Sequence, residues 1–202
     1  MGWANRITVL RGFLTLGLWA LLVLDGPAPS AGTWWIALWA FAAIAVSDLL
    51  DGFLARRFGE VSVFGRIADP LVDKMLVLGT MVILLGTAPG RAVLPAWMVA
   101  VMLTRELLVT ALRGAVEGRG ASFQAMPIGK AKMLVQSLAV GGVMVHAAGT
   151  PWVHAELPVL SALPAPHHPW CFAHLLVWLA TLLTVASGID YAVRAASALR
   201  RA

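Results

Sequence analysis

Long apolar runs alternate with short breaks along the chain. Six runs are long enough to cross a hydrocarbon layer as helices, since a span needs about 20 residues. They cover about residues 7–25, 33–57, 65–87, 93–116, 127–148 and 170–195. Glycine and proline cluster in the breaks, at 26–32, 87–90, 118–120 and 151–169. The pattern predicts one all-α integral membrane domain over residues 1–202, with six transmembrane helices.

Composition and charge support this class. Of the 202 residues, 60% are hydrophobic and 12% are charged, which is too apolar for a soluble domain. The single cysteine, Cys171, excludes an internal disulfide framework. If the N-terminus is cytoplasmic, every Lys and Arg except Arg91 falls on or near the cytoplasmic side. The net charge of +5 is therefore attributed to topology and anionic lipid, with no nucleic acid as partner.

The first 32 residues allow a second interpretation. Two arginines precede an apolar run, and small residues and prolines follow it, which is also the outline of a cleavable secretory signal.

Carboxylates gather in residues 47–74, which hold four of the chain's six aspartates: Asp48, Asp51, Asp69 and Asp73. The first two are spaced i, i+3 and the last two i, i+4, so each pair shares a helix face. A short turn at 57–64 lets the second helix return beside the first. We therefore expect the four carboxylates to converge at the cytoplasmic ends of two spans.

Carboxylates at such close range repel each other unless cations lie among them or their pKa values rise. All-oxygen ligation favours Mg²⁺ or Mn²⁺ over Zn²⁺. Gly52 and Gly65 would let a phosphate approach the backbone, and Arg56 would add a fixed positive charge. These features indicate phosphoryl-group chemistry on two metal ions.

The full spacing is D-x2-D-G-x2-A-R-x8-G-x3-D-x3-D, and the chain matches it at every position: Asp48, Asp51, Gly52, Ala55, Arg56, Gly65, Asp69 and Asp73. It resembles the signature of the CDP-alcohol phosphatidyltransferase family. These membrane enzymes join a CDP-linked lipid or alcohol to a second alcohol and release CMP. The resemblance implies a bacterial inner or plasma membrane location and a homodimer, and the Lys and Arg asymmetry predicts that both termini and the active site are cytoplasmic.

The resemblance also implies residue roles. The four aspartates would ligate two Mg²⁺ or Mn²⁺ ions, with Asp73 as general base. The CDP group would be bound by Asp51, Gly52, Ala55, Arg56, Ser62 and Gly65. An N-x2-T-x2-R segment near the N-terminus, Asn5, Thr8 and Arg11, is similar to one found in relatives and would place Asn5 and Thr8 near the nucleotide. A helix cap with interfacial arginines is the alternative for these three.

Basic residues in the fourth and fifth runs predict a second pocket. Arg105, Arg113, Lys130 and Lys132 would bind the phosphate of an acceptor, or Arg113 and the lysines would only snorkel to lipid headgroups. Glu106 lies beside Arg105 at the same depth. Lys74 is expected to face the acceptor phosphate or the headgroups. These segments resemble those of family members that join CDP-diacylglycerol to glycerol 3-phosphate.

Other functions stay open at this point. Within the family the acceptor could instead be inositol phosphate, serine, phosphatidylglycerol or a CDP-linked alcohol. From another class, a small cation or proton transporter also places acidic residues in its spans. The outer loop with His154, His167 and His168 is interpreted as interfacial rather than as a metal site, because the histidine spacing is irregular.

Overall fold

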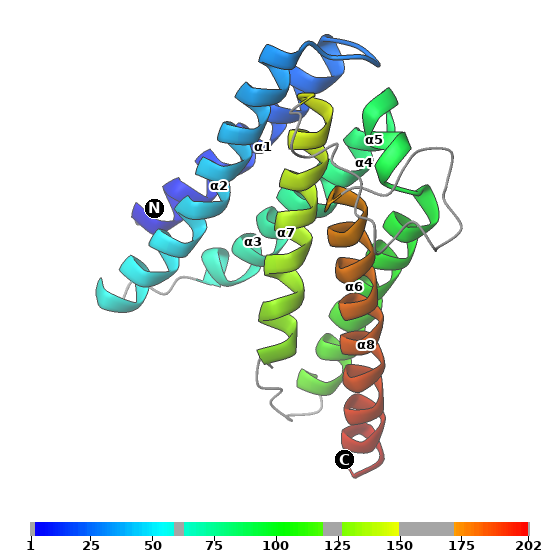
Figure 1. The fold of residues 1–202 in the computed structure, drawn as a ribbon. Coiled ribbons are helices and arrows are strands. Elements are labelled where there is room, and N and C mark those ends of the chain that lie inside the picture. Colours follow the sequence, from blue (N-terminus) through cyan, green and yellow to red (C-terminus); the bar gives the residue numbers. More distant parts are fainter. Residues whose placement is uncertain (1–2, 59–62, 119–126, 150–171, 202) are drawn as a thin grey trace.

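The described part of the chain consists of helices joined by short connections (Figure 1). The computed structural model describes residues 3–58, 63–118, 127–149 and 172–201, and side chains within them except at 3–4, 48–58, 63–64, 66–67, 127, 130 and 198–201. No strand occurs in these ranges, which confirms the all-α class. The elements are α1 (Trp3–Leu24), α2 (Ala31–Phe58), α3 (Val63–Lys74), the π-helix η1 (Met75–Gly79), α4 (Thr80–Leu85), α5 (Ala88–Val93), α6 (Ala96–Glu117), α7 (Pro127–Ala147) and α8 (Phe172–Arg201).

Six long helical segments occupy the predicted runs, with α3, η1 and α4 forming the third of them. The short α5 was not predicted: Thr87 caps it by accepting a hydrogen bond from the Gly90 N–H at 3.1 Å, and Pro89 lies in its first turn. Two helical stretches, Asn5–Leu24 and Phe172–Ser197, are apolar and long enough to cross a membrane. Shorter apolar stretches are Ala31–Ser47 and Ala131–Ala147. Six membrane crossings therefore remain a prediction.

The first helix runs parallel to the third segment. Three hydrogen bonds join α1 to α3 and α4: Thr8 donates to Asp69, Arg11 to Asp73 and Trp19 to Thr80. The residue numbers of the partners differ by 61, 62 and 61. Such a constant offset requires the two segments to run in the same direction. They approach closely at Gly79, where an added Cβ would lie 2.1 Å from Cζ2 of Trp19, so only glycine fits there.

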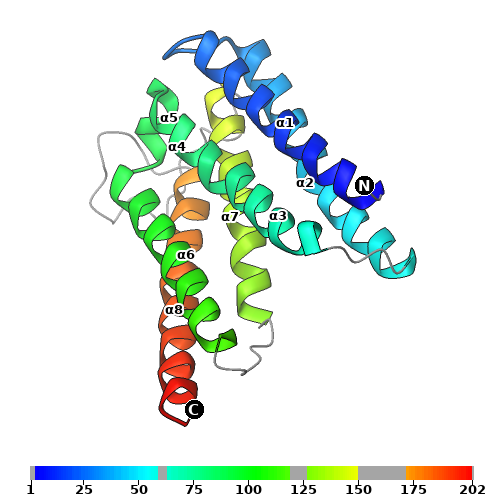
Figure 2. The same cartoon turned by 180° about the vertical axis from the view of Figure 1, so that it is seen from behind.

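On the other side of the molecule, α7 packs antiparallel to α8, and α8 lies beside α6 (Figure 2). Gln136 on α7 donates to Thr184 on α8, whereas Gly142, further along α7, lies near Leu176, earlier along α8. Polar and apolar side chains gather at different ends of these packed helices, which gives two regions of the molecule. We call them the polar end, containing Arg11, Asp73, Glu106, Lys132 and Gln136, and the apolar end, containing Leu84, Val93, Leu94, Val140 and Met144.

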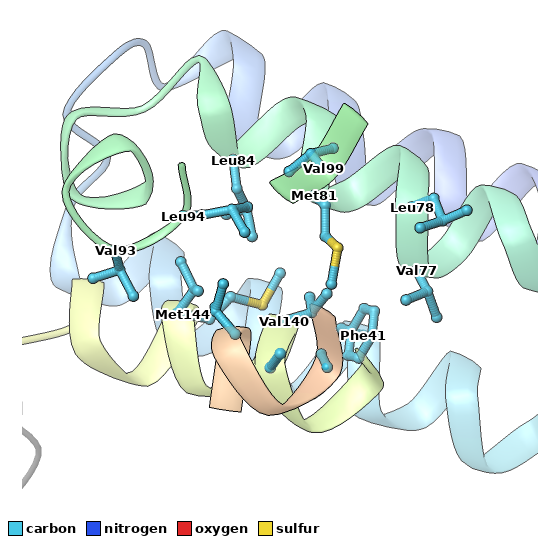
Figure 3. Close-up of a cluster of buried hydrophobic side chains, with 14 of the residues drawn as sticks. Phe41, Val77, Leu78, Met81, Leu84, Val93, Leu94, Val99, Val140 and Met144 are labelled. Carbon is cyan, nitrogen blue, oxygen red and sulfur yellow. The ribbon is translucent and has the colours of Figure 1, made fainter. Parts of the chain in front are cut away.

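The apolar end holds the main core (Figure 3). The five residues that define this end come from α4, α5 and α7 and the connection after α5, and each is at most 1% exposed. The core around them also takes in buried side chains of α1, α2, η1, α6 and α8. Burial of this much apolar surface holds the helices together at one end and fixes how they meet at the other. The predicted site lies at that other end.

Candidate active site

The polar end is built around two aspartates on α3. Asp69 and Asp73 are one helical turn apart, and each contacts α1. Thr8 donates its hydroxyl to Oδ1 of Asp69 at 2.5 Å, and the Arg11 guanidinium donates to Oδ1 of Asp73 at 2.6 Å. Arg11 is 2% exposed, so this ion pair is largely removed from water. Neighbouring carboxylates repel, and the Arg11 charge offsets part of that repulsion.

The N-x2-T-x2-R segment therefore faces the acidic motif. Asn5, Thr8 and Arg11 are all buried on one side of α1, and Gly65 is buried one turn before Asp69. The expectation that α1 contributes to the site agrees with these positions. Contact of Asn5 and Thr8 with a nucleotide remains a prediction.

The other half of the acidic motif lies on α2. Its backbone is helical through Phe58, so positions 48 and 51 are one turn apart along it. The side chains of Asp48, Asp51, Ala55 and Arg56, the surroundings of Gly52, and the whole of Ser62 lie outside the described part of the chain. Convergence of the four carboxylates thus stays a prediction.

A cavity of about 120 Å³ opens beside Asp73. Its polar lining comes from α3, α6 and α7, in the form of Asp73, Lys74, Glu106, Lys132 and Gln136. Two lysines and two carboxylates therefore border one small space. A carboxylate that can accept a proton lies next to ammonium groups that can bind an anion.

A buried ionic cluster forms one wall of this cavity. Oε1 of Glu106 accepts hydrogen bonds from Arg105, at 2.7 Å, and from the ammonium group of Lys132. Arg105 also donates to the Ser187 hydroxyl at 3.0 Å. Of the predicted acceptor residues, Arg105 and Lys132 are therefore brought together. Lys74, on α3, donates to the Thr110 hydroxyl of α6 at 2.5 Å.

The remaining two predicted acceptor residues are placed differently. Arg113 is exposed and lies over the Tyr191 ring, with the guanidinium carbon 5.9 Å from the ring centre. It does not line the cavity. The side chain of Lys130 lies outside the described residues.

Comparison with known proteins decides the class. The sequence model of the CDP-alcohol phosphatidyltransferase family matches residues 1–186. The chain belongs to this family. Family membership favours an enzyme over the transporter that the acidic residues alone left open.

Individual relatives agree with the family. A CDP-diacylglycerol–glycerol-3-phosphate 3-phosphatidyltransferase of Bacillus subtilis is 34% identical over 75% of this chain and 68% of its own. A probable phosphatidylglycerophosphate synthase of Mycobacterium tuberculosis is 35% identical over 95% of this chain and 80% of its own. A CMP-forming cardiolipin synthase of Streptomyces coelicolor is 37% identical over 52% of this chain and 46% of its own.

The donor set fits the metals expected for this phosphatidyltransferase. Asp69 and Asp73 offer carboxylate oxygens one turn apart, which suits a hard divalent cation such as Mg²⁺ or Mn²⁺. Among the described side chains, no group of three or more potential ligands forms, and the description does not include the side chains of Asp48 and Asp51. The two-ion site is accordingly kept as a proposal.

Sequence reasoning did not assign site roles to several polar residues. Glu106 was noticed beside Arg105 but was given no function, and Gln136, Thr184 and Ser187 were not singled out. A signal for Gln136 was present, since it lies i+4 from Lys132 within an apolar run, where a polar side chain usually faces a cavity or a partner.

Proposed function

We propose that this phosphatidyltransferase transfers the phosphatidyl group of CDP-diacylglycerol to glycerol 3-phosphate, giving phosphatidylglycerophosphate and CMP. The main structural support for this reaction is the cavity that Asp73 lines together with Lys74 and Lys132. The names of the Bacillus and Mycobacterium relatives support the same reaction.

The proposed chemistry begins with the acceptor. The phosphate of glycerol 3-phosphate lies between Lys74 and Lys132, with Arg105 behind them, and its free hydroxyl faces Asp73. Asp73 accepts the hydroxyl proton as that oxygen attacks the β-phosphorus, which carries diacylglycerol. The bond from this phosphorus to the bridging oxygen breaks, and CMP leaves with the bond electrons.

Residues of α2 and α3 hold the donor in this proposal. Gly52, Ala55, Arg56, Ser62 and Gly65 bind the CDP group together with Asp51, and Asn5 and Thr8 lie near it. The four aspartates, Asp48, Asp51, Asp69 and Asp73, hold two Mg²⁺ or Mn²⁺ ions. When bound, the ions neutralise charge on the diphosphate.

We further propose a multi-pass protein of a bacterial plasma membrane, with both termini and the site on the cytoplasmic side. The distribution of Lys and Arg supports this orientation. The gathering of charged side chains at one end of the helices also fits it. A homodimer is expected from the family resemblance.

Phosphatidylglycerol is the second candidate acceptor, because the Streptomyces relative is named a CMP-forming cardiolipin synthase. Two lysines beside a cavity of about 120 Å³ suit a small phosphate monoester better than a diacyl lipid.

The deciding experiment measures CMP release by detergent-purified protein with CDP-diacylglycerol and Mg²⁺. Glycerol 3-phosphate, inositol phosphate, serine and phosphatidylglycerol are offered separately. We expect release with glycerol 3-phosphate alone, and a fall of about 100-fold or more in Asp73→Asn, because general-base catalysis contributes this much. Asp190→Asn is the matched control, since Asp190 lies on α8 and pairs with Arg194. Release with another acceptor alone would contradict the proposed substrate and keep the family.

A further inference from the structure

Glu106 is a buried charged residue that the proposed reaction does not use. It is 8% exposed, lies on α6 and lines the cavity beside Asp73. Its Oε1 accepts from Arg105 on the same helix and from Lys132 on α7. A single carboxylate oxygen thus holds two cations.

Such a cluster costs free energy to bury. Removing charges from water is unfavourable, and a buried ion pair gives stability no better than apolar residues of similar volume. Two cations without the carboxylate would also repel each other. The arrangement is therefore better explained by the geometry it imposes on Arg105 and Lys132 than by stability.

We propose that Glu106 is a positioning residue of the acceptor pocket, which fixes Lys132 and Arg105 so that the Lys132 ammonium faces a phosphate monoester beside Asp73. This inference rests on the proposed function and deepens it. Glu106 acts through the two cations and does not touch the reacting atoms.

The α8 helix holds Arg105 from the other side. Ser187 accepts from Arg105 and donates its own proton to the Thr184 carbonyl at 3.0 Å, which directs a lone pair at the guanidinium. Gly188 leaves room for the side chain, because an added Cβ would lie 2.9 Å from Cγ of Arg105. Arg105 is thus fixed between α8 and Glu106.

The backbone of Glu106 is also linked to Lys74, the second lysine that lines the cavity. Thr110 donates to the Glu106 carbonyl at 2.7 Å and accepts from Lys74 at 2.5 Å. The ammonium groups of α3 and α7 are therefore both attached to one turn of α6. Two ammonium groups match a phosphate monoester, which carries nearly two negative charges at neutral pH.

The test replaces the carboxylate by an amide of the same size. In Glu106→Gln we expect the KM for glycerol 3-phosphate to rise about tenfold, because a neutral acceptor holds a cation more weakly than a carboxylate does. The KM for CDP-diacylglycerol should stay within about twofold, since the hydrogen bonds that the Glu106 carboxylate makes to described side chains go to Arg105 and Lys132, which are assigned to the acceptor. Glu106→Asp, which keeps the charge, should restore part of the loss.

A matched control and a second variant separate positioning from folding. Glu117→Gln makes the same change at an exposed position of α6 and should leave both KM values unchanged. Gly188→Ala displaces Arg105 from the α8 side and should reproduce the rise that is specific to the acceptor. If Glu106→Gln does not fold, Gly188→Ala decides the question.

Several results would overturn the inference. An unchanged KM for glycerol 3-phosphate would remove the positioning role, and a lower KM would show that Glu106 competes with the phosphate as an anion. Equal changes in both KM values, with a lower melting temperature, would indicate a structural role alone.

Direct binding keeps the two proposals distinguishable. Glycerol 3-phosphate is titrated calorimetrically into the purified protein without CDP-diacylglycerol. Weaker binding to Glu106→Gln than to wild type supports the inference even if CMP release selects another acceptor. CMP release with glycerol 3-phosphate and unchanged binding in the variant would overturn the inference and leave the function standing.

Discussion

The two ends of α7 bury side chains to a similar degree by opposite means. At the polar end, Lys132 is 5% exposed and its ammonium contacts Glu106. Two to three turns further on, Val140 and Met144 are fully buried against apolar neighbours (Figure 3). Burial of the Val140 and Met144 side chains is favourable by itself, whereas burial of the Lys132 ammonium would be unfavourable without Glu106. The apolar end therefore depends on volume, and the polar end depends on particular pairs.

The largest effect on stability is expected where a buried pair is broken. Arg11→Met keeps most of the side-chain length and removes the charge that Asp73 contacts. We expect a loss of roughly 3 kcal/mol or more in the free energy of unfolding, because the partly buried Asp73 carboxylate loses its ion pair with the buried Arg11. Denaturation of the purified protein in detergent measures it.

A double variant tests the reason for that loss. Arg11→Met combined with Asp73→Asn removes both charges and should recover most of the stability. A single variant as stable as wild type would mean that charge pairing does not organise the polar end.

The apolar end should respond to lost volume alone. Leu84→Ala removes a side chain that is 0% exposed, and we expect a loss of about 3 kcal/mol from lost burial and the cavity left behind. KM values for both substrates should not change. Leu138→Ala, at a position that is 51% exposed, is the matched control and should cost much less. A specific change in the acceptor KM of Leu84→Ala would show that the two ends are coupled.

The sequence was informative about elements because apolar length and Gly or Pro breaks act locally. The same rules failed at α5, where the proline and glycine of 87–90 were interpreted as a break and in fact lie in a short capped helix. The one-turn spacing of Asp69 and Asp73 is likewise a local property of α3 and is confirmed. No sequence signal that we used predicted the π-helix η1.

Contacts between helices were harder to predict, since they depend on packing angles and offsets that a single sequence does not state. Lys132 meets Glu106, 26 residues away, and Arg11 meets Asp73, 62 residues away. Arg113 was grouped with Arg105 because both are basic residues of the same apolar run, yet the packing of α6 on α8 places it over Tyr191. Residues near a site can be chosen from polarity, but their partners require the fold.

The smallest effect on stability is expected at an exposed polar contact. Such a contact is polar like the polar end but is not buried, so it tests whether burial is what makes the charge pairs there important. Asp25 lies between α1 and α2, where Gly26 adopts a φ of +86°. A hydrogen bond with the Thr33 side chain, and then one from the Ser30 backbone N–H at 2.9 Å, lower the pKa of Asp25 below its ordinary value of 3.8. Because the pKa is lower in the folded state, the ionised carboxylate stabilises the fold above the unfolded pKa. That contribution is lost as the pH falls through the folded pKa.

Asp25→Asn keeps the shape and cannot titrate in this range, so it isolates the charge. We expect its melting temperature in detergent to lie slightly below that of wild type at pH 6, and the difference to vanish as the pH falls through and below 3.8. The difference at pH 6 should be smaller than that of Arg11→Met or Leu84→Ala, because water solvates an exposed carboxylate when its partners are weakened. A loss of stability as large as that of Arg11→Met would mean that hydrogen bonds to a carboxylate stabilise the fold equally whether the carboxylate is buried or exposed. The contrast between the polar and apolar ends would then not be one of burial.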